Sequence, residues 1–261
     1  SFVPTVETAL DDLPSTYPDG CQVSRYDEEP IVCERGDPAG DVTVALVGDS
    51  KMAQWEPAFD LIGKRRGWRV VNITKSACEL SFSMPNWIDE PYPECLAWSE
   101  SVVGLVGELG IDVVVVSQVS RNAWDSEENP RDDGLILEGM TAAYRAVADA
   151  GADVVVMMDN PSPTVVVVDC VAEHEDDLAM CAFEQDDTND SGGRLALRAV
   201  AEAGGLPVVD MTDLVCPAGV CAPVIGDVLV YRNGSHLTAT YVRTMAESIE
   251  DRLAVVVEGT R

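Results

Sequence analysis

The chain has few basic residues and no long apolar run. Its 261 residues include only three lysines and two histidines, and 17 Lys and Arg stand against 46 Asp and Glu. The formal charge of −29 repels phosphate backbones and anionic lipid, which disfavours binding to nucleic acids and membrane surfaces. No run of about 18 apolar residues is free of charges and breakers, so no transmembrane helix is predicted. Hydrophobic residues, at 46%, suffice for one sizeable core.

The first residues also lack the basic and apolar regions of a signal peptide. A chain that begins so abruptly is expected to be a mature secreted protein or a domain of a larger one. Residues 1–40 are rich in Pro, Asp and turn residues, and we expect them to form a cysteine-containing extension packed on a domain that spans residues 41–261.

Cysteine is the second informative residue type. The eight cysteines fall into four close pairs, each enclosing a loop-like stretch, and neither histidine accompanies the tight knuckle of a zinc site. We therefore predict four disulfides and no metal, and folding in an oxidising compartment. Free buried thiols in a cytosolic enzyme are the alternative. The predicted pairs are Cys21–Cys33, Cys78–Cys95, Cys170–Cys181 and Cys216–Cys221.

Strand-like and helix-like segments alternate from residue 41 onward. Val-rich runs such as 112–117 and 153–158 are typical of parallel strands buried on both faces. The alternation predicts an α/β domain with a central parallel sheet of about five strands, covered by helices on both faces. The predicted strands are 42–47, 68–74, 112–117, 153–158 and 207–210, and the predicted helices are 53–66, 96–109, 135–150, 191–204 and 238–256.

Two residues stand out as candidates for chemistry. Ser50 follows the first predicted strand in a Gly48-Asp49-Ser50 turn, where ligands of open α/β sheets bind and where a helix N-terminus faces a developing oxyanion. A plain helix N-cap is its alternative role. His236 lies in a polar turn before the last predicted helix and is the natural base for a serine, although a structural role is open to it. His174, within an acidic stretch, is expected to be a solvated charge partner.

These residues lie in an ordered set of motifs: LVGDS at 46–50 with Gln54-Trp55, KSAC at 75–78, and YRNGSHLT at 231–238. The set resembles the SGNH/GDSL hydrolases, and more narrowly the SGNH domain fused behind the transmembrane acyltransferase-3 domain of bacterial O-acyltransferases. The resemblance covers nearly the whole chain. It implies a flavodoxin-like three-layer α/β/α sandwich without a cofactor. It also implies acyl transfer, usually of acetyl, to a hydroxyl of an envelope glycan through an acyl-serine intermediate, in the extracytoplasmic part of a membrane enzyme.

The sequence departs from the family pattern at three places. The Asp that usually precedes the histidine by three residues is Asn233, which can orient an imidazole but offers no negative charge. Asp227 would replace that charge if its loop folded back. Gln118 stands where an oxyanion-hole Asn is usual, with Asn122 as an alternative donor and a plain surface role equally open. Ser76 is the candidate at the position of the oxyanion-hole Gly.

Five aromatic residues lie on or near the loops that follow strands. Aromatic faces are favourable platforms for sugar rings, whereas core packing is the usual fate of Trp. The five are Trp55, Trp87, Tyr92, Trp98 and Trp124.

The predicted function is serine-dependent O-acyl transfer to a cell-envelope carbohydrate, with Ser50 as nucleophile, His236 as base and Asn233 as an unusual third member. A secreted carbohydrate O-acetyl esterase would use the same residues with water as acceptor. A catalytically impaired module that binds a glycan or docks a partner is the alternative outside the enzymes.

Overall fold

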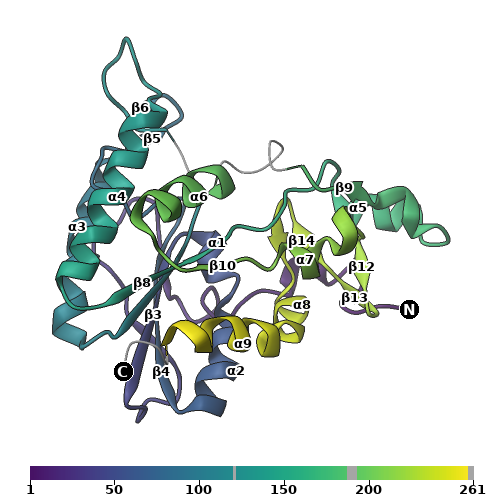
Figure 1. The fold of residues 1–261 in the computed structure, drawn as a ribbon. Coiled ribbons are helices and arrows are strands. Elements are labelled where there is room, and N and C mark those ends of the chain that lie inside the picture. Colours follow the sequence, from purple (N-terminus) through teal and green to yellow (C-terminus); the bar gives the residue numbers. More distant parts are fainter. Residues whose placement is uncertain (120–121, 187–192, 258–261) are drawn as a thin grey trace.

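The computed structural model describes residues 1–119, 122–186 and 193–257. Its sheet is built on five parallel strands in the spatial order β4-β3-β7-β8-β10 (Figure 1). In chain order this is 2-1-3-4-5, the flavodoxin-like arrangement. The strands are β3 (Val42–Gly48), β4 (Trp68–Lys75), β7 (Val113–Ser117), β8 (Asp153–Met157) and β10 (Val208–Val209).

The N-terminal residues add two short strands to this sheet. β1 (Gln22–Val23) pairs in parallel with the end of β4, and β2 (Cys33–Gly36) runs antiparallel along its beginning. The sheet therefore has seven strands within the described residues, where the sequence predicted about five. Segments this short and polar carry no strand pattern, and they are ordered by pairing with β4 and by the Cys21–Cys33 disulfide.

Successive strand residues point to opposite faces of the sheet, and both faces carry apolar side chains. Helices therefore cover both faces. One face of β3, including Val44 and Leu46, packs in a core with α2, α8 and α9, while Ala45 and Val47 face a second core with α3, α4 and α6. The predicted three-layer sandwich is confirmed (Figure 1). The helices are α2 (Glu56–Arg66), α3 (Pro93–Leu109), α4 (Asp133–Asp149), α6 (Gly193–Gly204), α8 (Ala239–Thr244) and α9 (Ala246–Val257).

The remaining elements are short and lie mostly in the connections. The long acidic stretch after β8 contains α5 (Val167–Glu173), the 3₁₀ turn η2 (Leu178–Cys181) and β9 (Phe183–Glu184). The predicted helix start at 191–192 lies outside the described residues. The others are η1 (Ala9–Asp11), α1 (Ser50–Ala53), β5 (Asn86–Trp87), β6 (Glu90–Pro91), α7 (Thr212–Val215), η3 (Pro217–Gly219), β11 (Val220–Cys221), β12 (Val224–Ile225), β13 (Val228–Leu229), β14 (Tyr231–Asn233) and β15 (His236–Leu237).

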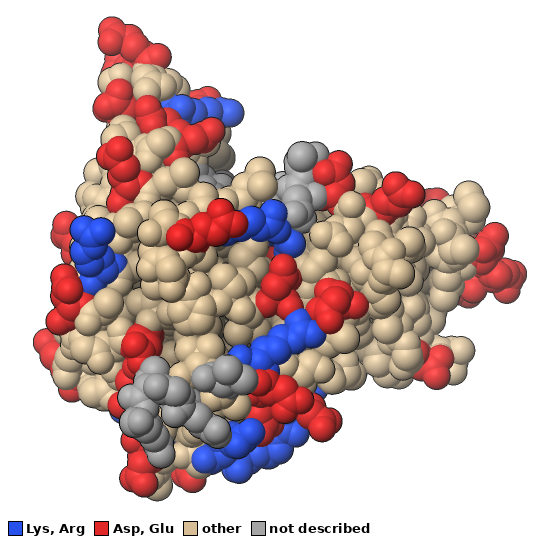
Figure 2. All heavy atoms as spheres, in the orientation of Figure 1, with Lys and Arg blue, Asp and Glu red and all other residues tan. Residues whose placement is uncertain are grey.

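All four predicted cysteine pairs are disulfide-bonded in the structure. Within the described ranges, no helix combines the length and the apolar character that crossing a bilayer requires. On the face shown in Figure 2, acidic side chains are spread over the whole surface, and basic ones gather in a few places.

Candidate active site

Ser50 lies at the point where the sheet changes its winding direction. It opens α1 directly after β3, and the neighbouring strand β7 leads to α4 on the opposite face. Gly48 makes this turn possible: its φ is +145°, and a Cβ atom there would lie 2.1 Å from the Ser117 carbonyl oxygen on β7. The crevice beyond the strand ends at such a switch point is where open α/β sheets bind ligands.

Asp49 fixes the turn that carries Ser50. Its Oδ1 caps α1 by accepting the Lys51 N–H at 2.8 Å, and its Oδ2 accepts the Val119 N–H at 3.0 Å. The side chain thus ties the loop after β3 to the loop after β7. Burial raises the pKa of the Asp49 carboxyl to about 7, although both backbone donors favour its charged form.

His236, the first residue of β15, contacts Ser50. Its Nε2 lies 2.9 Å from Ser50 Oγ, and its Nδ1 lies 3.3 Å from the backbone carbonyl oxygen of Asn233. A carbonyl can only accept a hydrogen bond, so Nδ1 carries the proton and Nε2 is free to accept the serine proton. A serine hydroxyl hydrogen-bonded to an unprotonated imidazole nitrogen has the geometry that a nucleophile and a general base need.

The side chain of Asn233 was expected to orient the His236 ring, but the backbone of Asn233 makes this contact instead. The amide side chain is exposed, and the backbone carbonyl holds the imidazole instead. Asp227 does not replace the missing charge: it occupies the turn between β12 and β13, where its carbonyl oxygen accepts the Val3 N–H. Among the described residues, the ring of His236 therefore has no carboxylate partner.

The electrostatic surroundings of His236 favour its neutral form. Burial, the Lys51 ammonium and the Arg232 guanidinium lower the pKa of the imidazole from its usual 6.5 to about 3, and the Asn233 carbonyl offsets only part of this. The ring is thus unprotonated, as a base must be, at any ordinary pH. If the ring took up a proton, no carboxylate among the described residues would contact the imidazolium.

A buried ionic network holds the histidine loop against the serine helix. Lys51, which is 1% exposed, lies 2.9 Å from Asp159 Oδ1. The same ammonium donates to Asn160 Oδ1 at 3.0 Å and to the Ser235 carbonyl oxygen at 2.9 Å. One cation from the residue after the candidate nucleophile therefore holds the residue before the candidate base.

Two amides complete this network. Gln54 donates to Asn160 Oδ1 at 2.8 Å and accepts the Leu237 N–H at 3.0 Å. Asn160 Nδ2 donates to the Ser235 carbonyl oxygen at 2.8 Å. Sequence reasoning placed Gln54 only within a motif and missed Lys51, Asp159 and Asn160. One signal was present, because Lys51 is one of three lysines and adjoins the candidate nucleophile.

The oxyanion donors differ in part from those expected. The Ser76 N–H is already used, because it donates to the Val23 carbonyl oxygen on β1 at 2.9 Å. The next residue, Ala77, adopts a left-handed conformation with φ +50°. Neither the Ala77 N–H nor the Ser50 N–H at the start of α1 has a hydrogen-bond partner among the described residues. These two backbone groups are the better candidates.

Gln118 lies at the end of β7 and is fully buried. Its Oε1 accepts the Leu80 N–H at 2.8 Å, whereas its Nε2 has no partner among the described residues. A buried donor left without an acceptor suits a site where negative charge develops. Asn122, the alternative, directs its amide to Asp133. Gln118 therefore stays the side-chain candidate.

The second histidine lies away from this site. His174 Nδ1 is 3.0 Å from the Cys170 carbonyl oxygen, and its ring lies beside the sulfurs of Cys170 and Cys181. Because these sulfurs form a disulfide, they are not available as thiolate ligands for a metal.

Comparison with known proteins identifies the family. The family model described as "SGNH domain (fused to AT3 domains)" matches residues 19–251, which is most of the chain. The chain belongs to this SGNH family. The resemblance noted in the sequence is thereby confirmed, and membership places the protein among SGNH-type enzymes of acyl transfer or ester hydrolysis.

Two solved structures are similar to the chain at low sequence identity. The periplasmic domain of a lipopolysaccharide acetyltransferase from Salmonella ser. Paratyphi A has a TM-score of 0.64 and 10% identity, with 98% of each chain covered. A GDSL-like lipase from Bacteroides thetaiotaomicron has a TM-score of 0.45 and 13% identity, covering 84% of this chain and 89% of the lipase. The comparison with curated proteins gives no match.

Proposed function

We propose that this SGNH domain transfers an acyl group, acetyl in the simplest case, to a hydroxyl of a cell-envelope glycan through an acyl-Ser50 intermediate. The observation that carries the proposal is the 2.9 Å contact between Ser50 Oγ and an imidazole nitrogen whose tautomer is set to accept a proton. Family membership adds that such a pair belongs to acyl chemistry.

The residues act in two half-reactions. Ser50 Oγ attacks the donor carbonyl carbon while His236 Nε2 takes the hydroxyl proton, and the imidazolium then gives that proton to the leaving group. A glycan hydroxyl next attacks the acyl-serine, its proton passes to Nε2, and the proton returns to Ser50 Oγ. In both steps the Ser50 and Ala77 N–H groups and Gln118 Nε2 are the donors proposed for the oxyanion.

The wider setting is also part of the proposal. The family description names fusion to AT3 domains, and the Salmonella domain of similar fold is periplasmic. Four disulfides suit an oxidising compartment. We therefore propose an extracytoplasmic domain tethered through an N-terminal transmembrane acyltransferase domain, which would deliver the acyl donor.

Covalent labelling tests the nucleophile. A fluorophosphonate probe should add to the wild-type chain at Ser50, as shown by mass spectrometry of its peptides, and should not add to Ser50→Ala or His236→Ala. Ser101→Ala, which removes an exposed serine of α3, is the matched control and should label like the wild type. Labelling that persists in Ser50→Ala would refute the assignment, and an unlabelled wild type would favour a catalytically impaired module.

Acceptor dependence tests the reaction type. With a chromogenic acetyl ester as donor, oligosaccharides should divert acetyl from water to sugar, and the product is detected by mass spectrometry. Hydrolysis that no sugar diverts would favour the esterase and contradict the transferase.

A further inference from the structure

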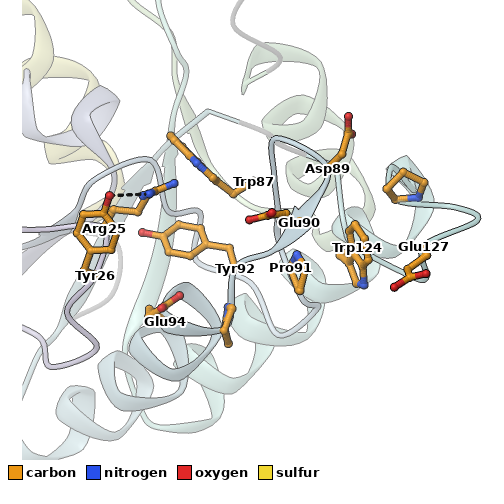
Figure 3. Close-up of a pocket in the computed structure, with 12 residues that line it drawn as sticks. Arg25, Tyr26, Trp87, Asp89, Glu90, Pro91, Tyr92, Glu94, Trp124 and Glu127 are labelled. Atoms are coloured by element: carbon orange, nitrogen blue, oxygen red, sulfur yellow. Dashed lines mark hydrogen bonds between the residues drawn. The ribbon is translucent and has the colours of Figure 1, made fainter.

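An open pocket of about 1080 Å³ lies on the loops that extend beyond the strand ends. This volume is slightly above the roughly 300–1,000 Å³ typical of ligand sites, so more than one sugar ring fits. Figure 3 shows its lining, which combines aromatic and charged side chains and includes Arg25, Trp87, Glu90, Tyr92, Trp124 and Glu127.

The pocket is joined to the candidate active site through two loops. Tyr92 OH donates to the Ser76 carbonyl oxygen at 3.1 Å, directly before the candidate oxyanion donor Ala77. The loop after β4 also pairs with the loop after β7 through a bridge between Pro85 and Ala123. Both loops begin at strands that flank β3, so the pocket and Ser50 lie beyond the same edge of the sheet.

Lys75 holds the part of the pocket wall that is formed by Arg25 and Tyr26. Its ammonium donates to the carbonyl oxygens of Ser24, Arg25 and Asp27 at 2.6–3.0 Å and lies 5.2 Å from the centre of the Tyr92 ring. It thereby holds the segment that carries Arg25 and Tyr26 against the pocket. This wall is built into the fold by a cation buried at the end of β4.

Aromatic rings form the opposing sides of the pocket. The rings of Trp87 and Tyr92 contact each other edge to face, with 6.0 Å between their centres. The guanidinium carbon of Arg25 lies 4.6 Å from the centre of the Trp87 ring. Figure 3 shows Trp124 on the far side of Glu90 and Pro91 from this pair. Trp55 and Trp98 are buried in the cores and do not line the pocket, and Tyr92 lines it but is only 2% exposed. Of the five aromatic candidates, Trp87 and Trp124 are therefore the two that line the pocket and are only partly buried. Amphipathic rings with a polar edge suit the apolar faces of sugars.

The charge of the lining is negative. Asp89 is paired with Arg131 at 2.7 Å, whereas Glu90, Glu94 and Glu127 add three further carboxylates. Among the lining residues that the structure describes, the guanidinium of Arg25 is the one cation. Carboxylates accept hydrogen bonds from hydroxyl and ammonium groups, and they repel a carboxylate or phosphate on the ligand.

We infer that this pocket binds the acceptor glycan, and that it selects a segment of several sugar units without anionic groups. The inference rests on the proposed function, since it names the acceptor class for the proposed reaction. The aromatic rings stack on the sugar faces, and the carboxylates accept from hydroxyl or amino groups. A neutral chain and an amino-bearing chain both fit, and a uronic-acid chain does not.

Titration calorimetry on the Ser50→Ala chain tests the inference without depending on catalysis. Three probes of equal length are used: cellotetraose, the fully deacetylated tetramer of glucosamine, and tetragalacturonic acid. The first two should bind, the glucosamine tetramer more tightly at low salt, and tetragalacturonic acid should not. Labelling of the wild type at Ser50, measured separately, reports on the proposed function, so the two can fail independently.

Variants then locate the binding. Trp87→Ala and Trp124→Ala should each weaken binding of cellotetraose about tenfold, as loss of an aromatic anchor does. Glu127→Gln should weaken the glucosamine tetramer about threefold, while its exposed neighbour Glu128→Gln, which does not line the pocket, leaves it unchanged. Equal binding of tetragalacturonic acid, no binding of the other two probes, or unchanged affinity in both Trp variants that retain the wild-type melting temperature would overturn the inference.

Discussion

Replacing Asn233 with alanine should lower the rate of Ser50 acylation by less than about tenfold, because the contact to His236 uses the backbone. The Nδ1 of the ring lies 3.3 Å from the Asn233 carbonyl oxygen, and that oxygen remains in any substitution. The side chain is exposed and takes no part. Where a serine protease relies on a carboxylate at this place, the change from Asp to Asn costs about 10⁴ in kcat.

The assay is the second-order rate of fluorophosphonate labelling, with hydrolysis of a chromogenic acetyl ester as a second measure. His236→Ala is the control that removes the base and should lower both rates far more. A loss of about 10³ or more in Asn233→Ala, with an unchanged melting temperature, would refute the backbone assignment. Asn233→Asp is informative in the other direction. A carboxylate beside the ring should raise the pKa of His236 above its value of about 3. The fall of the labelling rate in acid should then occur at a higher pH.

Three further predictions concern the network, the pH dependence and the disulfides. Lys51→Met leaves the Asp159 carboxylate buried without its ammonium, and it should lower the free energy of unfolding in urea by about 3–5 kcal/mol; a loss below 1 kcal/mol would contradict the buried pair. Folding lowers the pKa of His236 from 6.5 to about 3, so the neutral ring contributes stability above pH 6.5 that is lost as the pH falls toward 3. For the same reason, the labelling rate should show no inflection from this residue near pH 6.5. Replacing both Cys21 and Cys33 with serine should cost about 2–4 kcal/mol, measured as a lower melting temperature, and an unchanged value would show that β1 and β2 need no crosslink.

Much of the fold follows from local pattern. The Val-rich runs that become β7 and β8 are buried on both faces, which only a central parallel strand requires, and so they were recognisable without the structure. The cysteines that pair are 5 to 17 residues apart, so nearness along the chain identified the partners. β1 and β2 escaped prediction because their order comes from pairing with β4.

The candidate site divides in the same way. Its sequence motifs pointed to Ser50 and His236, since a nucleophile after a strand and a base before a helix sit at positions that the chain itself defines. The tertiary structure decided the rest. The backbone carbonyl oxygen of Asn233, and not its side chain, contacts the His236 ring. The Ser76 N–H donates to β1, and the Lys51 ammonium contacts Asp159 and Ser235. These contacts join residues more than fifty positions apart or depend on the direction of a backbone carbonyl, and the spacing of residue types along the chain reveals neither.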